Sequence, residues 1–265
     1  MLTSNMGLRF MSYPQNLLTK FSSLSPVTAF PSIKTVKGAF SCSCCVVCQF
    51  NLDDFSSKKR HLERVYSTNS NGKFSNKQFI SVDSELYDYI LSNVREPEIL
   101  AQLREETASM RGSKMQGYSS LAVALVLPES GRLVACDRDL ECLEVAKRYY
   151  ELAGVSHKVD VRHGLAADTL KSLIANGEAS SYDFAFIDAE KRMNEEYFEL
   201  LLQLVRVRGL IVIDNVLWYG KVADPMVDDK MTDSIRRLNK KIMEDDRVGI
   251  SMVPIGDGMT ICQKR

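Results

Sequence analysis

Between Ser84 and the C-terminus, short apolar segments alternate with segments whose apolar positions recur at helical spacing. Apolar runs of strand length lie at residues 131–137, 157–164, 181–188 and 209–214. Helical patterns lie at residues 84–94, 96–110, 140–154, 166–177, 194–206 and 228–245. This alternation predicts an α/β fold with a doubly wound, mostly parallel Rossmann-like sheet. Two more strand patterns surround a Gly-Asp-Gly turn in residues 248–264 and predict a terminal antiparallel hairpin.

The first 83 residues differ in composition from the rest, and we interpret them as a disordered transit peptide and linker before a domain at 84–265. Residues 1–52 contain no Asp or Glu, four basic residues and many Ser and Thr. Acid-poor, Ser-rich N-termini are typical of organelle transit peptides. The Ser and Thr content favours a plastid over a mitochondrion, and a tail without an address in a cytoplasmic protein is the alternative. We expect the mature chain to begin between the cysteine cluster at 42–48 and Ser84.

The cysteine cluster admits a second interpretation. It consists of Cys42, Cys44, Cys45 and Cys48. The Cys45-x-x-Cys48 spacing is that of metal or redox sites, but His61 is the only nearby residue that could complete a zinc site. The end of a transit peptide is therefore favoured over a functional thiol site. The other three cysteines lie in apolar or helical patterns, which predicts buried small side chains and no disulfide framework.

The composition argues against two classes of binding partner, nucleic acids and membranes. The chain is 45% hydrophobic and 26% charged, which is enough for one sizeable core, and its formal net charge is zero. A nucleic-acid or membrane surface would need clustered excess Lys and Arg, so neither partner is expected.

Three predicted strands end on an acid, at Asp137, Asp188 and Asp214. Because ligands bind outside the carboxyl ends of parallel strands, these side chains should line one edge of the sheet. For Asp137, a cap of the next helix and a ligand for a ribose diol are equally good interpretations. Asp188, Asp214 and the following Asn215 offer hard oxygen ligands, which suit Mg, Mn or Ca.

Several segments resemble one family. They are VREPEILAQLREET (94–107), GYSSLAVALVLPESG (117–131), FAFIDAEK (184–191), LIVIDNVLWYGKVADP (210–225) and VPIGDGMTICQK (253–264). They resemble the cation-dependent class I O-methyltransferases, which use S-adenosylmethionine (SAM) and include the caffeoyl-CoA O-methyltransferase-like proteins. The resemblance runs from about Ser84 to Arg265.

The resemblance implies the following roles. The divalent cation falls on Asp188, Asp214 and Asn215, and the general base on Lys191, for which a solvated lysine at a helix start is the alternative. The SAM contacts fall on Ser119 at the methionine end, Asp137 at the ribose, Ala166 at the adenine, and Glu190, where the family usually has Asp. A cation that chelates two vicinal oxygens lowers the pKa of a hydroxyl, and a lysine can then accept its proton. We expect a catechol-like or phenylpropanoid substrate and a homodimer.

The sequence also departs from the family. Between Gln116 and Gly117 it lacks a helix, the first strand and the glycine turn that holds the methyl donor, on the order of 30 residues. Loss of this central strand should leave two neighbours unpaired, and residues 121–127 are the one candidate to fill the gap, although a helix is favoured there. Arg208 replaces a glycine and Tyr219 replaces an asparagine that touches substrate in the caffeoyl-CoA enzymes. A catalytically inactive isoform that dimerises with a full-length copy is the alternative function.

Overall fold

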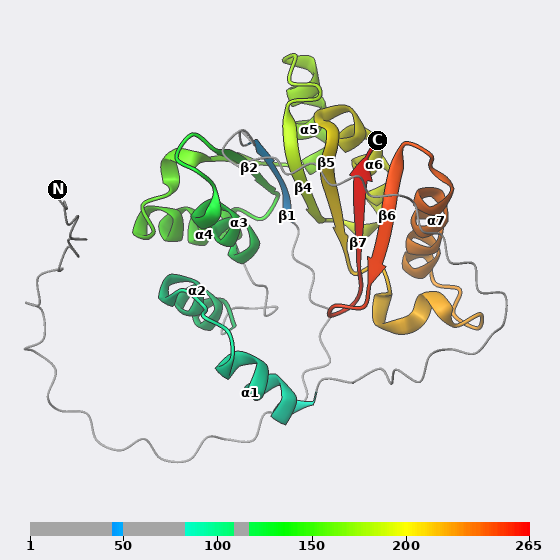
Figure 1. The fold of residues 1–265 in the computed structure, drawn as a ribbon, viewed down its shortest axis with the longest axis horizontal. Coiled ribbons are helices and arrows are strands. Elements are labelled where there is room, and N and C mark those ends of the chain that lie inside the picture. Colours follow the sequence, from blue (N-terminus) through cyan, green and yellow to red (C-terminus); the bar gives the residue numbers. More distant parts are fainter. Residues whose placement is uncertain (1–43, 50–82, 109–116) are drawn as a thin grey trace, which may run out of the picture. The chain divides into compact units, whose positions relative to one another are not determined.

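The computed structural model describes residues 44–49, 83–108 and 117–265. These residues form one seven-stranded sheet of order β3-β2-β1-β4-β5-β7-β6. Figure 1 shows β1 between β2 and β4. The strands are β1 (Cys44–Gln49), β2 (Arg132–Asp137), β3 (Val159–His163), β4 (Tyr182–Asp188), β5 (Val205–Asp214), β6 (Val248–Val253) and β7 (Met259–Lys264). Strands β2 to β6 run in one direction, while β1 and β7 run in the other. The fold is therefore the predicted Rossmann-like one, with the predicted terminal hairpin.

The central slot of the sheet is filled by β1, which corrects the expectation of two unpaired neighbours. Cys45 is the register partner of Cys136 on β2 and of Ile187 on β4, and both pairings are antiparallel. The substitute is thus residues 44–49, which hold three of the four clustered cysteines, and not residues 121–127, which are helical as favoured. Physically, CCVVCQ is a short apolar run, and burial on both faces suits a central strand.

This strand also changes the interpretation of the N-terminal stretch. Residues 44–49 belong to the sheet, although the sequence placed them in a transit peptide and linker. A mature chain beginning after the cysteine cluster would lose its central strand, so any cut consistent with this fold lies before Cys44. The rest of the stretch, residues 1–43 and 50–82, lies outside the described residues, as does His61.

Two apolar cores lie on opposite faces of the sheet, and β1 contributes to both. Cys45 and Val47 pack in one core, and Val46 and Cys48 pack in the other. The first core contains the buried faces of α5 (Ala166–Ala175), α6 (Asn194–Leu204) and α7 (Lys230–Glu244). The second contains those of α2 (Glu98–Ala108), α3 (Tyr118–Val126) and α4 (Leu140–Leu152). This two-sided cover is the doubly wound arrangement that the pattern predicts.

The remaining elements are short. Helix α1 spans Ser84–Ser92, and 3-10 turns occupy η2 (Ser156–Lys158), η3 (Lys191–Met193) and η4 (Trp218–Ala223). Strand β5 begins at Val205, inside the predicted helix, and its register with β4 shifts between Tyr182 and Phe184. At this irregularity Arg208, which stands at a family glycine, has φ +70°. None of the helices in the described part of the chain is long and apolar enough to cross a membrane.

Candidate active site

The three predicted acids do end parallel strands of the sheet. Asp137 is the last residue of β2, Asp188 of β4 and Asp214 of β5. The carboxylate of Asp188 interacts electrostatically with those of Asp214 and Asp137, so all three lie near one another at the carboxyl edge. The amino end of β1 reaches the same edge, because Cys44 is the register partner of Asp188.

Lys191 lies at the start of η3 with its side chain only 4% exposed. Its Nζ donates to Oδ1 of Asp188 over 2.6 Å. The alternative of a solvated lysine is therefore wrong. Burial raises the pKa of Asp188 to about 6, with Lys191 opposing this rise and Asp214 and Asp137 adding to it.

Asn215 follows Asp214 in a left-handed conformation, with φ +61°. Its backbone N–H donates to Oδ1 of Asp214 over 2.7 Å. Its own Oδ1 is buried and has no hydrogen-bond partner in the structure. A buried acceptor without a donor costs free energy, and a bound cation would satisfy it. Two carboxylates and this amide therefore fit a hard divalent cation, although the described residues hold no group of three His, Cys, Asp or Glu that could bind a metal.

Asp137 is buried, and its Oδ1 accepts the backbone N–H of Asp139 over 2.9 Å. The cap of α4 is Asp139, whose carboxylate accepts from Glu141 and Cys142 at the first turn. The helix-cap interpretation thus belongs to Asp139. Asp137 keeps its place at the sheet edge, where an acid can hold a ribose diol.

A pocket opens between the start of α5 and the segment after β4. Its lining includes Arg138, Ala166, Glu190 and Tyr197. The carboxylate of Glu190 accepts a hydrogen bond from Nε of Arg192 over 2.9 Å. Hydrogen bonding to Arg192 lowers the pKa of the Glu190 carboxyl. The structure therefore brings together two of the predicted SAM contacts, Ala166 and Glu190.

The other two predicted SAM contacts, Ser119 and Asp137, do not line that pocket. Ser119 is half-buried in the first turn of α3. Next to it, Gly117 has φ +74°, and a Cβ there would lie 2.6 Å from Cβ of Ala146. The start of α3 is therefore packed tightly on α4.

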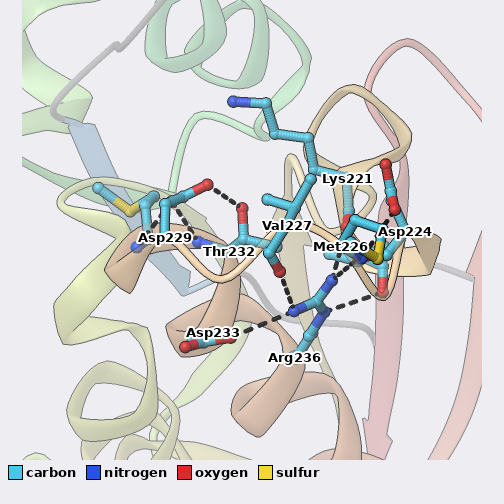
Figure 2. A network of polar contacts seen from close by, with 10 residues as sticks. Lys221, Asp224, Met226, Val227, Asp229, Thr232, Asp233 and Arg236 are labelled. Atoms are coloured by element: carbon cyan, nitrogen blue, oxygen red, sulfur yellow. Dashed lines mark hydrogen bonds and ion pairs between the residues drawn. The ribbon is translucent and has the colours of Figure 1, made fainter.

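The end of η4 and the segment that follows it are held by Arg236 of α7 (Figure 2). Its guanidinium donates to the carbonyl oxygens of Lys221 over 2.9 Å, Val222 over 3.0 Å and Val227 over 2.6 Å, and also to that of Asp224. Four carbonyls on one side chain fix residues 221–227 beside the carboxyl edge. Sequence reasoning missed this residue because an arginine on a polar helix face gives no separate signal.

The O-methyltransferase family model matches residues 100–265. The chain belongs to this family. It is 40% identical over 195 residues to tricin synthase 1 of Oryza sativa subsp. japonica, covering 69% of this chain and 77% of that protein. It is 36% identical over 218 residues to the caffeoyl-CoA O-methyltransferase of Petroselinum crispum, covering 68% and 90%. With the catechol O-methyltransferase domain-containing protein 1 of Mus musculus, 39% identical, the chain spans only 63% of the relative's length.

Solved structures agree with this assignment. The O-methyltransferase TomG of Streptomyces achromogenes, in complex with SAM, matches with a TM-score of 0.60 and 27% identity over 68% of this chain and 96% of TomG. The O-methyltransferase of Bacillus cereus, in complex with SAH, matches with a TM-score of 0.59 and 26% identity over 67% and 96%. The structural neighbours are thus SAM-dependent O-methyltransferases, and the chain has the same fold.

The alignment with the Petroselinum crispum enzyme also bears on the missing block. Its 218 positions would amount to more than four fifths of a 265-residue chain, yet it takes in 68% of this one. The relative therefore carries residues that have no counterpart here. The alternative of an inactive, dimerising isoform finds no support in these comparisons.

Proposed function

We propose that this chain is a divalent-cation-dependent O-methyltransferase that transfers a methyl group from SAM to one hydroxyl of a catechol-like or phenylpropanoid molecule. The observation that carries the proposal is the grouping of Asp188, Asp214 and Asn215 at two adjacent strand ends, with the buried Lys191 against Asp188. Hard oxygen ligands and a lysine in one place suit a metal-assisted proton transfer.

The metal-binding residues and Lys191 have separate roles in the proposed methyl transfer. Asp188, Asp214 and Asn215 would hold the cation, which when bound lowers the pKa of a coordinated hydroxyl. Lys191 Nζ lies 2.6 Å from Asp188 and would take the hydroxyl proton once the lysine has lost its own proton. The methyl group then passes from the sulfonium sulfur to the oxygen, and the sulfur keeps the bonding electron pair.

The proposed SAM site is less complete than the proposed metal site. Ala166 and Glu190 line the pocket proposed for the adenosine end. At the methionine end of the donor, the central strand β1 begins at this edge of the sheet, with Cys44. In the family, the first strand instead ends at this edge and continues into the glycine turn that holds the donor. Loss of about three hydrogen bonds at roughly 1.5 kcal/mol each would weaken SAM binding over a thousandfold.

The proposal is tested by methyl-transfer assays with labelled SAM at high concentration. We expect product from compounds with vicinal hydroxyls in the presence of Mg²⁺ or Mn²⁺, and little from matched monohydroxy phenols or after chelation. Asp214→Ala should lose this activity. Equal methylation of monohydroxy phenols without a divalent cation would refute the metal-dependent mechanism.

Donor binding is measured separately, by calorimetric titration with SAM. A version with the family's missing block inserted between Gln116 and Gly117 should bind SAM far more tightly. Micromolar binding by the present chain would show that the glycine turn is dispensable here.

A further inference from the structure

Asp257 lies at the tip of the β6–β7 hairpin, in the turn Gly256-Asp257-Gly258. This tip is next to the proposed metal site, because Met259 at the start of β7 is the register partner of Asp214. The carboxylate of Asp257 interacts electrostatically with Asp214 and Lys191. The hairpin therefore brings a fourth carboxylate, from a distant part of the chain, to the same edge of the sheet as Asp137, Asp188 and Asp214.

The hairpin tip is hydrogen-bonded to the segment that follows β5. The N–H of Val216 donates to the carbonyl of Gly258 over 3.1 Å, and that of Leu217 to the carbonyl of Asp257 over 3.0 Å. Oδ1 of Asp257 accepts the N–H of Tyr219. Contact is close, since a Cβ at Gly258 would lie 2.2 Å from Cγ of Leu217.

This segment needs such support because its backbone is unfavourable. Asn215, Trp218 and Tyr219 all have positive φ, at 61°, 47° and 55°. A residue with a Cβ in this region costs about 1 kcal/mol, so three of them persist only where neighbouring groups fix them. In the described structure, Asp257 is the side chain that accepts a backbone N–H of residues 216–220, and Asn239 donates from the other side to the carbonyl of Val216 over 2.9 Å.

The second carboxylate oxygen of Asp257 provides an independent observation. Oδ2 is buried and has no hydrogen-bond partner in the structure, as is also true of Oδ1 of Asn215. A buried carboxylate oxygen without a donor is uncommon and calls for an explanation. Its burial beside Asp214 and Lys191 is expected of a group that belongs to the polar site.

We propose that Asp257 is a positioning residue of the metal site: it holds residues 215–220 so that Asn215 presents its amide oxygen beside Asp188 and Asp214. The inference rests on the proposed function, because it assigns Asp257 a task at the same site. Asp257 acts through the loop and touches neither substrate nor donor.

The test compares Asp257→Ala, Asp257→Asn and a matched control, Asp224→Ala. Asp224 also accepts a backbone N–H through Oδ1, from Met226 over 2.9 Å, but lies farther along the loop and is exposed. The readout is the Mn²⁺ concentration that gives half of the maximal thermal stabilisation. Asp257→Ala should raise this concentration at least about tenfold, as loss of a residue that supports a metal ligand does. Asp257→Asn keeps the acceptor oxygen and should stay close to wild type, as should Asp224→Ala.

Two results would overturn the inference. One is an unchanged half-maximal concentration in Asp257→Ala, even if that variant is less stable, because Asp257 would then be only a turn residue. The other is Asp257→Asn behaving like Asp257→Ala, because charge and not the hydrogen bond would then matter.

Amide hydrogen exchange in metal-free protein separates this inference from the proposed function. Exchange at residues 216–220 should accelerate in Asp257→Ala and not in the control. A wild-type protein with no metal response refutes the proposed function, while the exchange rates still decide whether Asp257 holds the loop. Unchanged exchange in Asp257→Ala overturns the inference whatever the metal response.

Discussion

Cys45 of β1 lies directly opposite Cys136 of β2, and both side chains are fully buried. Burial raises the pKa of Cys136 to about 12, and that of Cys45 well above its ordinary value. The pair marks the place where a segment from the N-terminal stretch completes the sheet of the domain.

Thiol labelling follows from this burial. Because the thiolate is the reactive form, we expect Cys45, Cys48 and Cys136 to resist a maleimide at neutral pH and to react when the protein is unfolded by denaturant. Peptide mass spectrometry identifies the modified residues. Rapid labelling of Cys45 and Cys48 while Cys136 stays protected would contradict the placement of β1.

A charged side chain in β1 should destabilise the domain. Val47 is fully buried between Val134 and Ala185, so Val47→Asp is expected to lower the free energy of unfolding by roughly 3 kcal/mol or more. Val126→Asp is the matched control, because Val126 is 79% exposed and should tolerate the same change. Urea denaturation measures the free energy of unfolding of both variants. If Val47→Asp lowers it no more than Val126→Asp does, β1 contributes nothing to stability.

Arg208→Gly should stabilise the protein. The backbone of Arg208 has φ +70°, and its side chain is exposed, so glycine relieves strain and loses little packing. We expect a gain of about 1 kcal/mol in the free energy of unfolding, reduced somewhat by the greater freedom of glycine in the unfolded chain. The adjacent Val207→Gly, at a position without positive φ, should destabilise instead. A loss of stability in Arg208→Gly would show that the strain is absent.

Metal binding should weaken in acid. The pKa of Asp188 in the folded protein is about 6, above its ordinary 3.8, because burial disfavours the charged form. Without metal, the stability that this carboxyl contributes is therefore fully present below pH 3.8 and is lost as the pH rises through 6. A divalent cation needs the deprotonated carboxylate, so the metal-dependent rise in Tm should be small below pH 6 and large above it.

Thermal scans with and without Mn²⁺ on both sides of this pKa check the expectation. Asp214→Ala, which removes a ligand, should show no metal-dependent rise at any pH. A wild-type rise of equal size at acid and neutral pH would contradict the role of Asp188.

The sequence was sufficient for the elements whose period is unambiguous. The helix at 140–154 and the strand at 181–188 are found within two residues of the predicted bounds, and the acids at the strand ends do share one edge. It was not sufficient for β1, because an apolar run of five residues carries no sign of its partners, which lie far along the chain. Nor did spacing reveal that Lys191 is buried, or that Asp257, in a common turn motif, reaches the site. These depend on tertiary contacts.

The antiparallel β1 has a consequence for how the chain folds. Residues 44–49 are synthesised well before their partners on β2 and β4. This apolar segment therefore stays unpaired in the nascent chain until those strands have been synthesised. Closing so long a loop makes the central pairing slow, and contacts of this kind give a high contact order. Until they pair, the apolar segment 44–49 and the open edges of β2 and β4 are surfaces of the kind on which aggregation starts. Yield in the cell should therefore depend on chaperones and temperature more than the equilibrium stability of the finished sheet would indicate.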